Sequence, residues 1–177
     1  WELMVERLNS DLANTLGNLV NRTISMSNKY FGGLVENKNA ILSENDSAID
    51  ADLKAVITGV PAKVKAKMDD LRVADALTEI FTIFKRCNKY IDETMPWALG
   101  KDESKKARLA AVMYTLCESL RIISILLEPF MPSTTPRIQA QLGLTAENAS
   151  YDSAAEWGRL PADAVIQKGE TLFPRRS

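Results

Sequence analysis

The polar residues with the most distinctive spacing lie within the first thirty positions of the chain. Five asparagines occur there, although asparagine costs on the order of 0.5 kcal/mol relative to alanine inside a helix. On a helical wheel of about 100° per residue, one polar row falls opposite a leucine stripe and consists of Asn14, Asn18, Asn21, Arg22 and Ser25. Amide and guanidinium groups suit the reading of nucleobase edges. The spacing alone leaves open whether the row reads bases or is merely solvated or packed against loops.

A tryptophan in a locally basic segment is the second candidate. Trp97 follows Pro96, which ends a predicted helix, and it lies outside the apolar periodicity of both neighbouring helices. Residues 85–108 contain seven basic and four acidic side chains, a net charge of +3 in a chain whose total is −1. Aromatic rings beside basic groups capture single-stranded bases by stacking. The alternative, a tryptophan that closes the end of a helical bundle, remains open on sequence grounds.

Catalytic and metal-binding candidates are few. The chain has no histidine, which excludes Ser-His-Asp and Cys-His nucleophile activation and histidine-based zinc or di-iron sites. Asp69, Asp70 and Asp75 could hold a divalent cation, but no second acidic cluster faces them. We expect a solvated helix end there and assign no metal. No glycine-rich phosphate-binding loop occurs.

Composition indicates a soluble globular protein able to form a core without disulfides, with 177 residues of which 46% are hydrophobic and 25% charged. Cys87 and Cys117 lie in apolar periodic runs and are expected to be buried. No apolar run approaches the roughly 18 residues of a membrane span, so we expect a cytoplasmic protein without membrane contact. The isoelectric point near 5.6 requires any nucleic-acid contact to be local. Because the chain opens with Trp1, we expect a domain of a longer protein.

Apolar spacing predicts the long helices that must position these candidates. A leucine-rich stripe over 5–26 predicts a first helix that ends near Gly32 and Gly33. Steps of three and four residues over 73–91 and 109–130 predict two further helices, each apolar on one face.

The remaining connections are less regular. A polar loop is expected over 35–45, followed by a helix that Pro61 bends or interrupts. No sustained period occurs in the last part of the chain. The predicted fold is therefore an all-α antiparallel bundle of about five helices over 1–144, with an extended C-terminal tail over 145–177 that packs on the bundle or on a further domain.

Short motifs spread over the whole chain form a recognisable set. They are DLAN (11–14), GNLVNR (17–22), NKYF (28–31), NKYIDETMPWAL (88–99), LEPFMP (127–132), QLG (141–143) and LFPR (172–175). Together they resemble the anticodon-binding domain of bacterial methionyl-tRNA synthetases, which is an α-helical bundle. The resemblance covers essentially the whole chain.

This resemblance implies a partner and a set of contact residues. By motif position, Asn18, Arg22 and Trp97 would recognise the methionine anticodon CAU in the anticodon stem-loop of methionine tRNA. Supporting or phosphate contacts would come from a further set: Asn14, Asn21, Pro96, Lys89, Lys101 and Lys105.

The same resemblance implies that catalysis resides elsewhere. A catalytic domain of the same polypeptide, expected before Trp1, would use ATP and Mg²⁺, with zinc where its insertion binds that metal. The chain alone is expected to need no cofactor, to be monomeric and to be inactive in aminoacylation.

Two alternatives are kept. A related class I synthetase uses a similar bundle for another tRNA, although the set of Asn18, Arg22 and Trp97 argues against it. A helical protein-interaction module without an RNA role receives slight support from the acidic isoelectric point.

Overall fold

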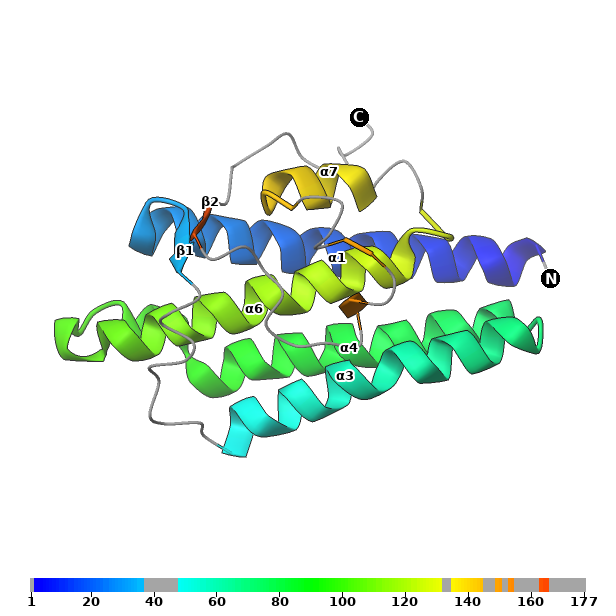
Figure 1. Ribbon diagram of the computed structural model, residues 1–177, viewed down its shortest axis with the longest axis horizontal. Helices are drawn as coiled ribbons and strands as arrows, with labels where there is room; N and C mark the ends of the chain where they lie inside the picture. The colour runs from blue at the N-terminus through cyan, green and yellow to red at the C-terminus, as the bar shows by residue number, and fades with distance from the viewer. Residues whose placement is uncertain are drawn as a thin grey trace.

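Four long helices form the body of the protein. The computed structural model describes residues 2–36, 48–131, 135–144, 149–150, 153–154 and 163–165. Within them, the long helices are α1 (Glu2–Phe31), α3 (Ala48–Asp69), α4 (Val73–Thr94) and α6 (Lys106–Leu127). Successive long helices run in opposite directions along the bundle (Figure 1). The predicted all-α antiparallel bundle is confirmed.

Helix α6 is the central element of this bundle. It contacts α1, α3 and α4, and residues 111–127 are buried without exception. The apolar spacing predicts a helix that is apolar on one face, and this prediction is wrong for α6, which is covered all round. Its buried serine and threonine hydroxyl groups donate to backbone carbonyls of the preceding turn, as when Ser119 Oγ donates to Thr115 O at 2.7 Å. Hydroxyl residues therefore do not mark a solvent-facing side of this helix.

The hydrophobicity of α6 reflects this central position. By length and composition, Arg108–Leu127 is the one helix in the described part of the chain that could cross a membrane. It qualifies although its apolar residues are interrupted, because Glu118 and Arg121 are the only charges after Arg108. Since residues 111–127 are all buried inside the bundle, the composition of the segment is that of a core helix.

Both cysteines lie in the core, as predicted. Cys87 of α4 and Cys117 of α6 are free thiols with no exposed surface. Burial raises the pKa of each thiol to about 12. Both therefore stay protonated near neutral pH and pack as small apolar side chains.

The end of α1 follows the sequence prediction. Gly32 and Gly33 adopt positive φ angles of 61° and 90°. Their N–H groups donate to Asn28 O at 3.1 Å and Ser27 O at 3.0 Å, which closes the helix in the usual glycine-containing cap. The glycines are needed here because other residues avoid this backbone region.

Two segments differ from the sequence predictions. Instead of a loop from residue 35, strand β1 (Leu34–Glu36) pairs antiparallel with β2 (Asp163–Val165), in a register that opposes Leu34 and Val165. The rest of the predicted loop lies outside the described residues. Helix α3 continues through Pro61, so an interruption there does not occur. Packing of α3 against α4 and α6 outweighs the hydrogen bond that proline removes.

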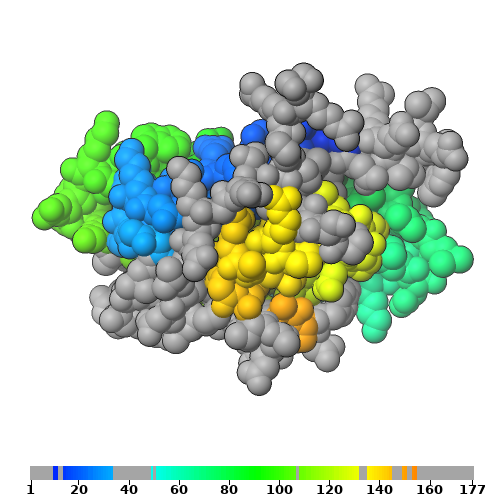
Figure 2. All heavy atoms as spheres, turned by 90° about the horizontal axis from the view of Figure 1, so that it is seen from above, coloured from blue at the N-terminus to red at the C-terminus, as the bar shows by residue number. Residues whose placement is uncertain are grey.

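Two described segments that follow α6 in the chain pack against it. Helix α7 (Thr135–Gln141) contacts α6 and lies at the molecular surface in Figure 2. Most of the predicted tail lies outside the described residues, but Ser153 is buried against α6. There Arg121, itself fully buried, pairs with Glu118 and donates from Nη1 to Ser153 Oγ at 3.0 Å and from Nη2 to Ser153 O at 3.1 Å. A buried charged pair thus holds part of the tail on the bundle.

Candidate nucleic-acid interface

The polar row predicted on α1 is exposed to solvent. Its opposite face supplies core residues such as Leu16 and Leu19, which are almost completely buried. The exposed members of the row are Asn14, Asn18, Asn21, Arg22 and Ser25. Burial of the leucine face therefore fixes the direction in which the amides and the guanidinium point.

Trp97 is presented by a single helical turn. After α4 ends, Met95 adopts the left-handed conformation with φ 47° and ψ 67°, and its N–H donates to Ile91 O at 3.0 Å. Helix α5 (Pro96–Leu99) begins with Pro96 at its first position, where proline is well tolerated. Pro96 is buried while Trp97 is 44% exposed. The left-handed turn at Met95 and the buried proline together place the indole at the surface.

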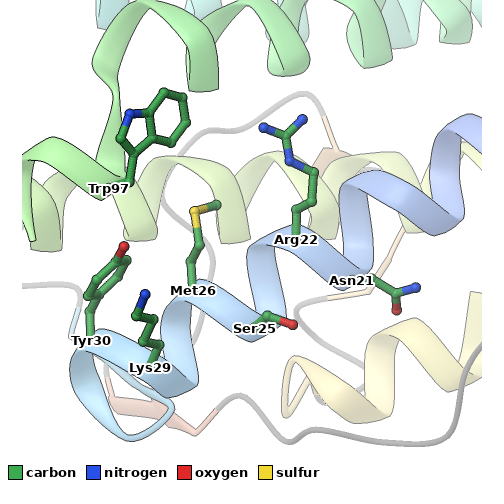
Figure 3. Close-up of a pocket in the computed structure, with 7 residues that line it drawn as sticks. All are labelled: Asn21, Arg22, Ser25, Met26, Lys29, Tyr30 and Trp97. Carbon is green, nitrogen blue, oxygen red and sulfur yellow. The ribbon is translucent and has the colours of Figure 1, made fainter.

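A surface pocket of about 390 Å³ lies between α1 and α5. Figure 3 shows Arg22 and Trp97 on the same side of α1, with Met26 between them and the Tyr30 hydroxyl directed toward Trp97. Asn21 points away from Trp97 in this view. The residues that line the pocket are Asn21, Arg22, Ser25, Met26, Lys29, Tyr30 and Trp97.

This set of side chains has a definite chemical character. The indole offers a flat face for stacking, the guanidinium of Arg22 a planar fork of donors, and Lys29 a mobile cation. Lys29 Nζ lies 5.4 Å from the Tyr30 ring centroid. This combination suits an unpaired nucleotide, which has a planar base with polar edges and an attached phosphate anion.

The pocket brings together part of the predicted site. Arg22, Asn21 and Trp97 line it, whereas Asn18 and Asn14 lie on the same exposed helix face toward the N-terminus, outside the pocket lining. Pro96 is buried, which fits a supporting role rather than a direct contact. The predicted phosphate contacts are all exposed but do not line the pocket: Lys89, Lys101 and Lys105.

Three pocket residues were missed by the sequence analysis. Met26 was assigned to the apolar stripe, and Lys29 and Tyr30 were given no site role. Arg22, Met26 and Tyr30 follow one another at intervals of four and so occupy one edge of the helix. This spacing was a usable signal, because a half-buried side chain next to a predicted reader contributes to the same surface.

The lysines after α5 are carried by a capped connection. Asp102 Oδ1 accepts hydrogen bonds from Ser104 N at 3.0 Å and Ser104 Oγ at 2.6 Å, at the start of the 3₁₀ helix η1 (Glu103–Lys105). These hydrogen bonds, with a smaller contribution from Lys105, lower the pKa of the Asp102 carboxyl. The ionised cap helps to order the connection on which Lys101 and Lys105 are exposed.

The acidic residues considered for a metal do not form a cluster. Asp69 and Asp70 are exposed at the end of α3, and Asp75 pairs with Arg72 at 2.5 Å. Within the described ranges, no three side chains of the His, Cys, Asp or Glu type come together as a metal site would require.

Comparison with known proteins shows that this helical bundle is of the anticodon-binding class. A family model described as the anticodon binding domain of methionyl tRNA ligase matches residues 38–176. The chain belongs to this family, so the resemblance inferred from the motifs is confirmed. The matched range begins after α1 and therefore does not include the polar row.

Curated relatives extend the similarity to almost the full chain. A methionine–tRNA ligase of Caldanaerobacter subterraneus subsp. tengcongensis is 47% identical over 98% of this chain, and that of Bacillus subtilis is 45% identical over 98%. In each case the aligned part is 26% of the relative. This chain thus spans about a quarter of their length.

Solved structures agree with the sequence relatives. The apo form of Mycobacterium tuberculosis methionyl-tRNA synthetase matches with a TM-score of 0.84 and 31% identity, over 98% of this chain and 34% of that one. The same synthetase bound by methionyl-adenylate gives the same TM-score and identity.

Proposed function

We propose that this chain is the part of a methionine–tRNA ligase that reads the anticodon CAU of methionine tRNA. The observation that carries the proposal is the pocket between α1 and α5, which Arg22 and Trp97 both line. These two residues come from segments far apart in the sequence, and the family to which the chain belongs is named for anticodon binding.

The chemistry of reading is divided among the side chains. Trp97 stacks on an unpaired anticodon base, since an indole face accepts any base. Arg22 donates hydrogen bonds to base edges, whereas Asn18 both donates and accepts them, which discriminates between bases. Asn14 and Asn21 lie beside them. Phosphate groups are held by exposed lysines around the same end of the bundle: Lys89, Lys101 and Lys105.

Catalysis belongs to the rest of the polypeptide in this proposal. ATP, Mg²⁺ and zinc would act in the catalytic domain, outside this chain, in a cytoplasmic enzyme. The chain alone is a monomer that binds methionine tRNA and gives no methionine-dependent pyrophosphate exchange.

The deciding experiment compares anticodon stem-loops that differ at one anticodon base. This chain should bind the CAU stem-loop and lose affinity when a base is altered. Arg22→Ala should cost about 1–3 kcal/mol and weaken discrimination at one position. Arg72→Ala, which removes an exposed arginine of the α3–α4 turn at the other end of the bundle, is the matched control and should change neither.

Other outcomes point to the alternatives. Preference for a stem-loop with a different anticodon would indicate a synthetase of another specificity. Absence of binding to any stem-loop would favour a protein-interaction module. Equal, unspecific losses from Arg22→Ala and Arg72→Ala would show that the row on α1 does not read bases.

A further inference from the structure

Gly100 lies at the end of α5, and the backbone conformation at this position does not require glycine. Its φ of −67° and ψ of −17° are ordinary right-handed values that any residue adopts. A Cβ atom there would nevertheless lie 2.5 Å from Cε1 and 3.0 Å from Cδ1 of Tyr30. The absence of a side chain at Gly100 therefore serves the close approach of the Tyr30 ring.

The Tyr30 ring links two elements that are far apart in the sequence. It belongs to the last turn of α1, whose end is held by the glycine cap, and it packs partly buried against the core. Lys29 Nζ lies over the ring at 5.4 Å from its centroid. In Figures 1 and 2 the connection from α4 to α6 lies beside the final turns of α1.

Helix α5 depends on such tertiary contacts for its position. A helix of four residues has no stability of its own. Its internal bonds include Gly100 N–H to Pro96 O at 2.9 Å, so the glycine and the turn that carries Trp97 move together. Pro96 is buried at one end of the turn. At the other end Leu99 packs against the core, and the adjacent Gly100 contacts the Tyr30 ring.

We propose that Tyr30 is a positioning residue for anticodon reading. Its ring wedges against Gly100 and sets the distance of Trp97 from Arg22, and hence which base fits between them. This inference rests on the proposed function. It assigns to Tyr30 an action through Trp97 and requires no direct contact of Tyr30 with RNA.

The test uses substitutions on both sides of the contact. Tyr30→Ala removes the ring, Gly100→Ala pushes against it, and Tyr30→Phe keeps all three contacting ring carbons. The double variant Tyr30→Ala/Gly100→Ala should show about the same resonance shift and the same loss of RNA affinity as Tyr30→Ala alone, because no ring remains for the new methyl group to contact. Gly59→Ala is the matched control, since a Cβ at Gly59 would have nothing within 4 Å.

The first readout needs no RNA. The chain has three tryptophans, and 5-fluorotryptophan labelling gives a ¹⁹F resonance for each, with that of Trp97 assigned by Trp97→Phe. Tyr30→Ala and Gly100→Ala should shift the Trp97 resonance of the free protein, whereas Tyr30→Phe and Gly59→Ala should leave it in place. An unshifted Trp97 resonance in folded Gly100→Ala would overturn the wedge even if Tyr30→Ala did not fold.

The second readout is affinity for the CAU stem-loop. Tyr30→Ala and Gly100→Ala should each weaken binding about tenfold and reduce discrimination against an altered base, with Tyr30→Phe close to the parent chain. A shifted resonance with unchanged discrimination would refute the positioning role. If the parent chain itself fails to bind, the proposed function is wrong, while the resonance shifts still report on the contact between Tyr30 and Gly100.

Discussion

Replacing Trp97 tests whether its side chain stacks on an anticodon base or only packs against the end of the bundle. Trp97 is 44% exposed, so a little over half of its surface contacts protein. Truncating a fully buried tryptophan to alanine costs about 3–5 kcal/mol, and scaling by the contacting fraction gives about 2 kcal/mol for Trp97→Ala. For a chain of this size we expect the melting temperature to fall by roughly 4–8 °C, which leaves the protein folded at 25 °C.

The loss of RNA affinity should be separable from this destabilisation. Stacking on one base is worth about 1–3 kcal/mol, so Trp97→Ala should bind the CAU stem-loop roughly 5- to 150-fold more weakly at 25 °C. Trp97→Phe keeps an aromatic face and should retain part of the affinity. Both quantities are measurable on the same samples, by thermal melting and by fluorescence anisotropy with a labelled stem-loop.

Met95→Ala is the control for this experiment. Met95 lies two residues away, is 47% exposed and does not line the pocket. Its replacement should affect stability slightly and affinity hardly at all. If Trp97→Ala melts many degrees lower while its folded fraction binds the stem-loop normally, Trp97 is a packing residue and the site is misplaced.

Three further predictions test the surroundings of the site. Contact with about four phosphates predicts a slope near −3 for log affinity against log salt, and Lys105→Ala should weaken all stem-loops alike, as titrations at several salt concentrations would show; a slope near zero would contradict this. Arg121→Met should lower the free energy of unfolding by about 3–5 kcal/mol because it removes the positive charge that pairs with the buried Glu118 carboxylate, and adding Glu118→Gln should restore part of it in urea melts. The pKa values of about 12 for Cys87 and Cys117 exceed the ordinary value of 9.0, so the unfolded chain releases these protons first and stability should fall as pH rises from about 9 to 12. Urea melts should show a smaller fall for Cys87→Ala, and native thiols should resist a thiol reagent at pH 8.

The parts of the fold predicted from the sequence are those set by local rules. Gly32 and Gly33 end α1 because few other residues adopt positive φ. The stripe that includes Leu16 and Leu19 fixes which side of α1 is buried, and therefore which side displays Asn18 and Arg22. A helix stop at Pro96 likewise places Trp97 between two helices and off both apolar faces.

Other parts depend on partners far away in the chain. No local pattern in Leu34–Glu36 predicts a strand, because the strand forms only by pairing with Asp163–Val165. The apolar spacing of α6 predicts one buried face, yet α7 and the segment at Ser153 cover its other side. Pro61 stays inside α3 because packing supplies what the missing hydrogen bond removes.

The pocket depends both on local sequence rules and on contacts between distant parts of the chain. Its reader residues follow from helix periodicity and a helix stop, but their separation follows from the contact between Tyr30 and Gly100. Such a contact leaves no pattern in a single sequence, because Tyr30 and Gly100 lie far apart in the chain and the ordinary φ and ψ of Gly100 are known only from the structure. The sequence therefore predicts which of these residues are displayed at the surface, but not how far Trp97 lies from Arg22.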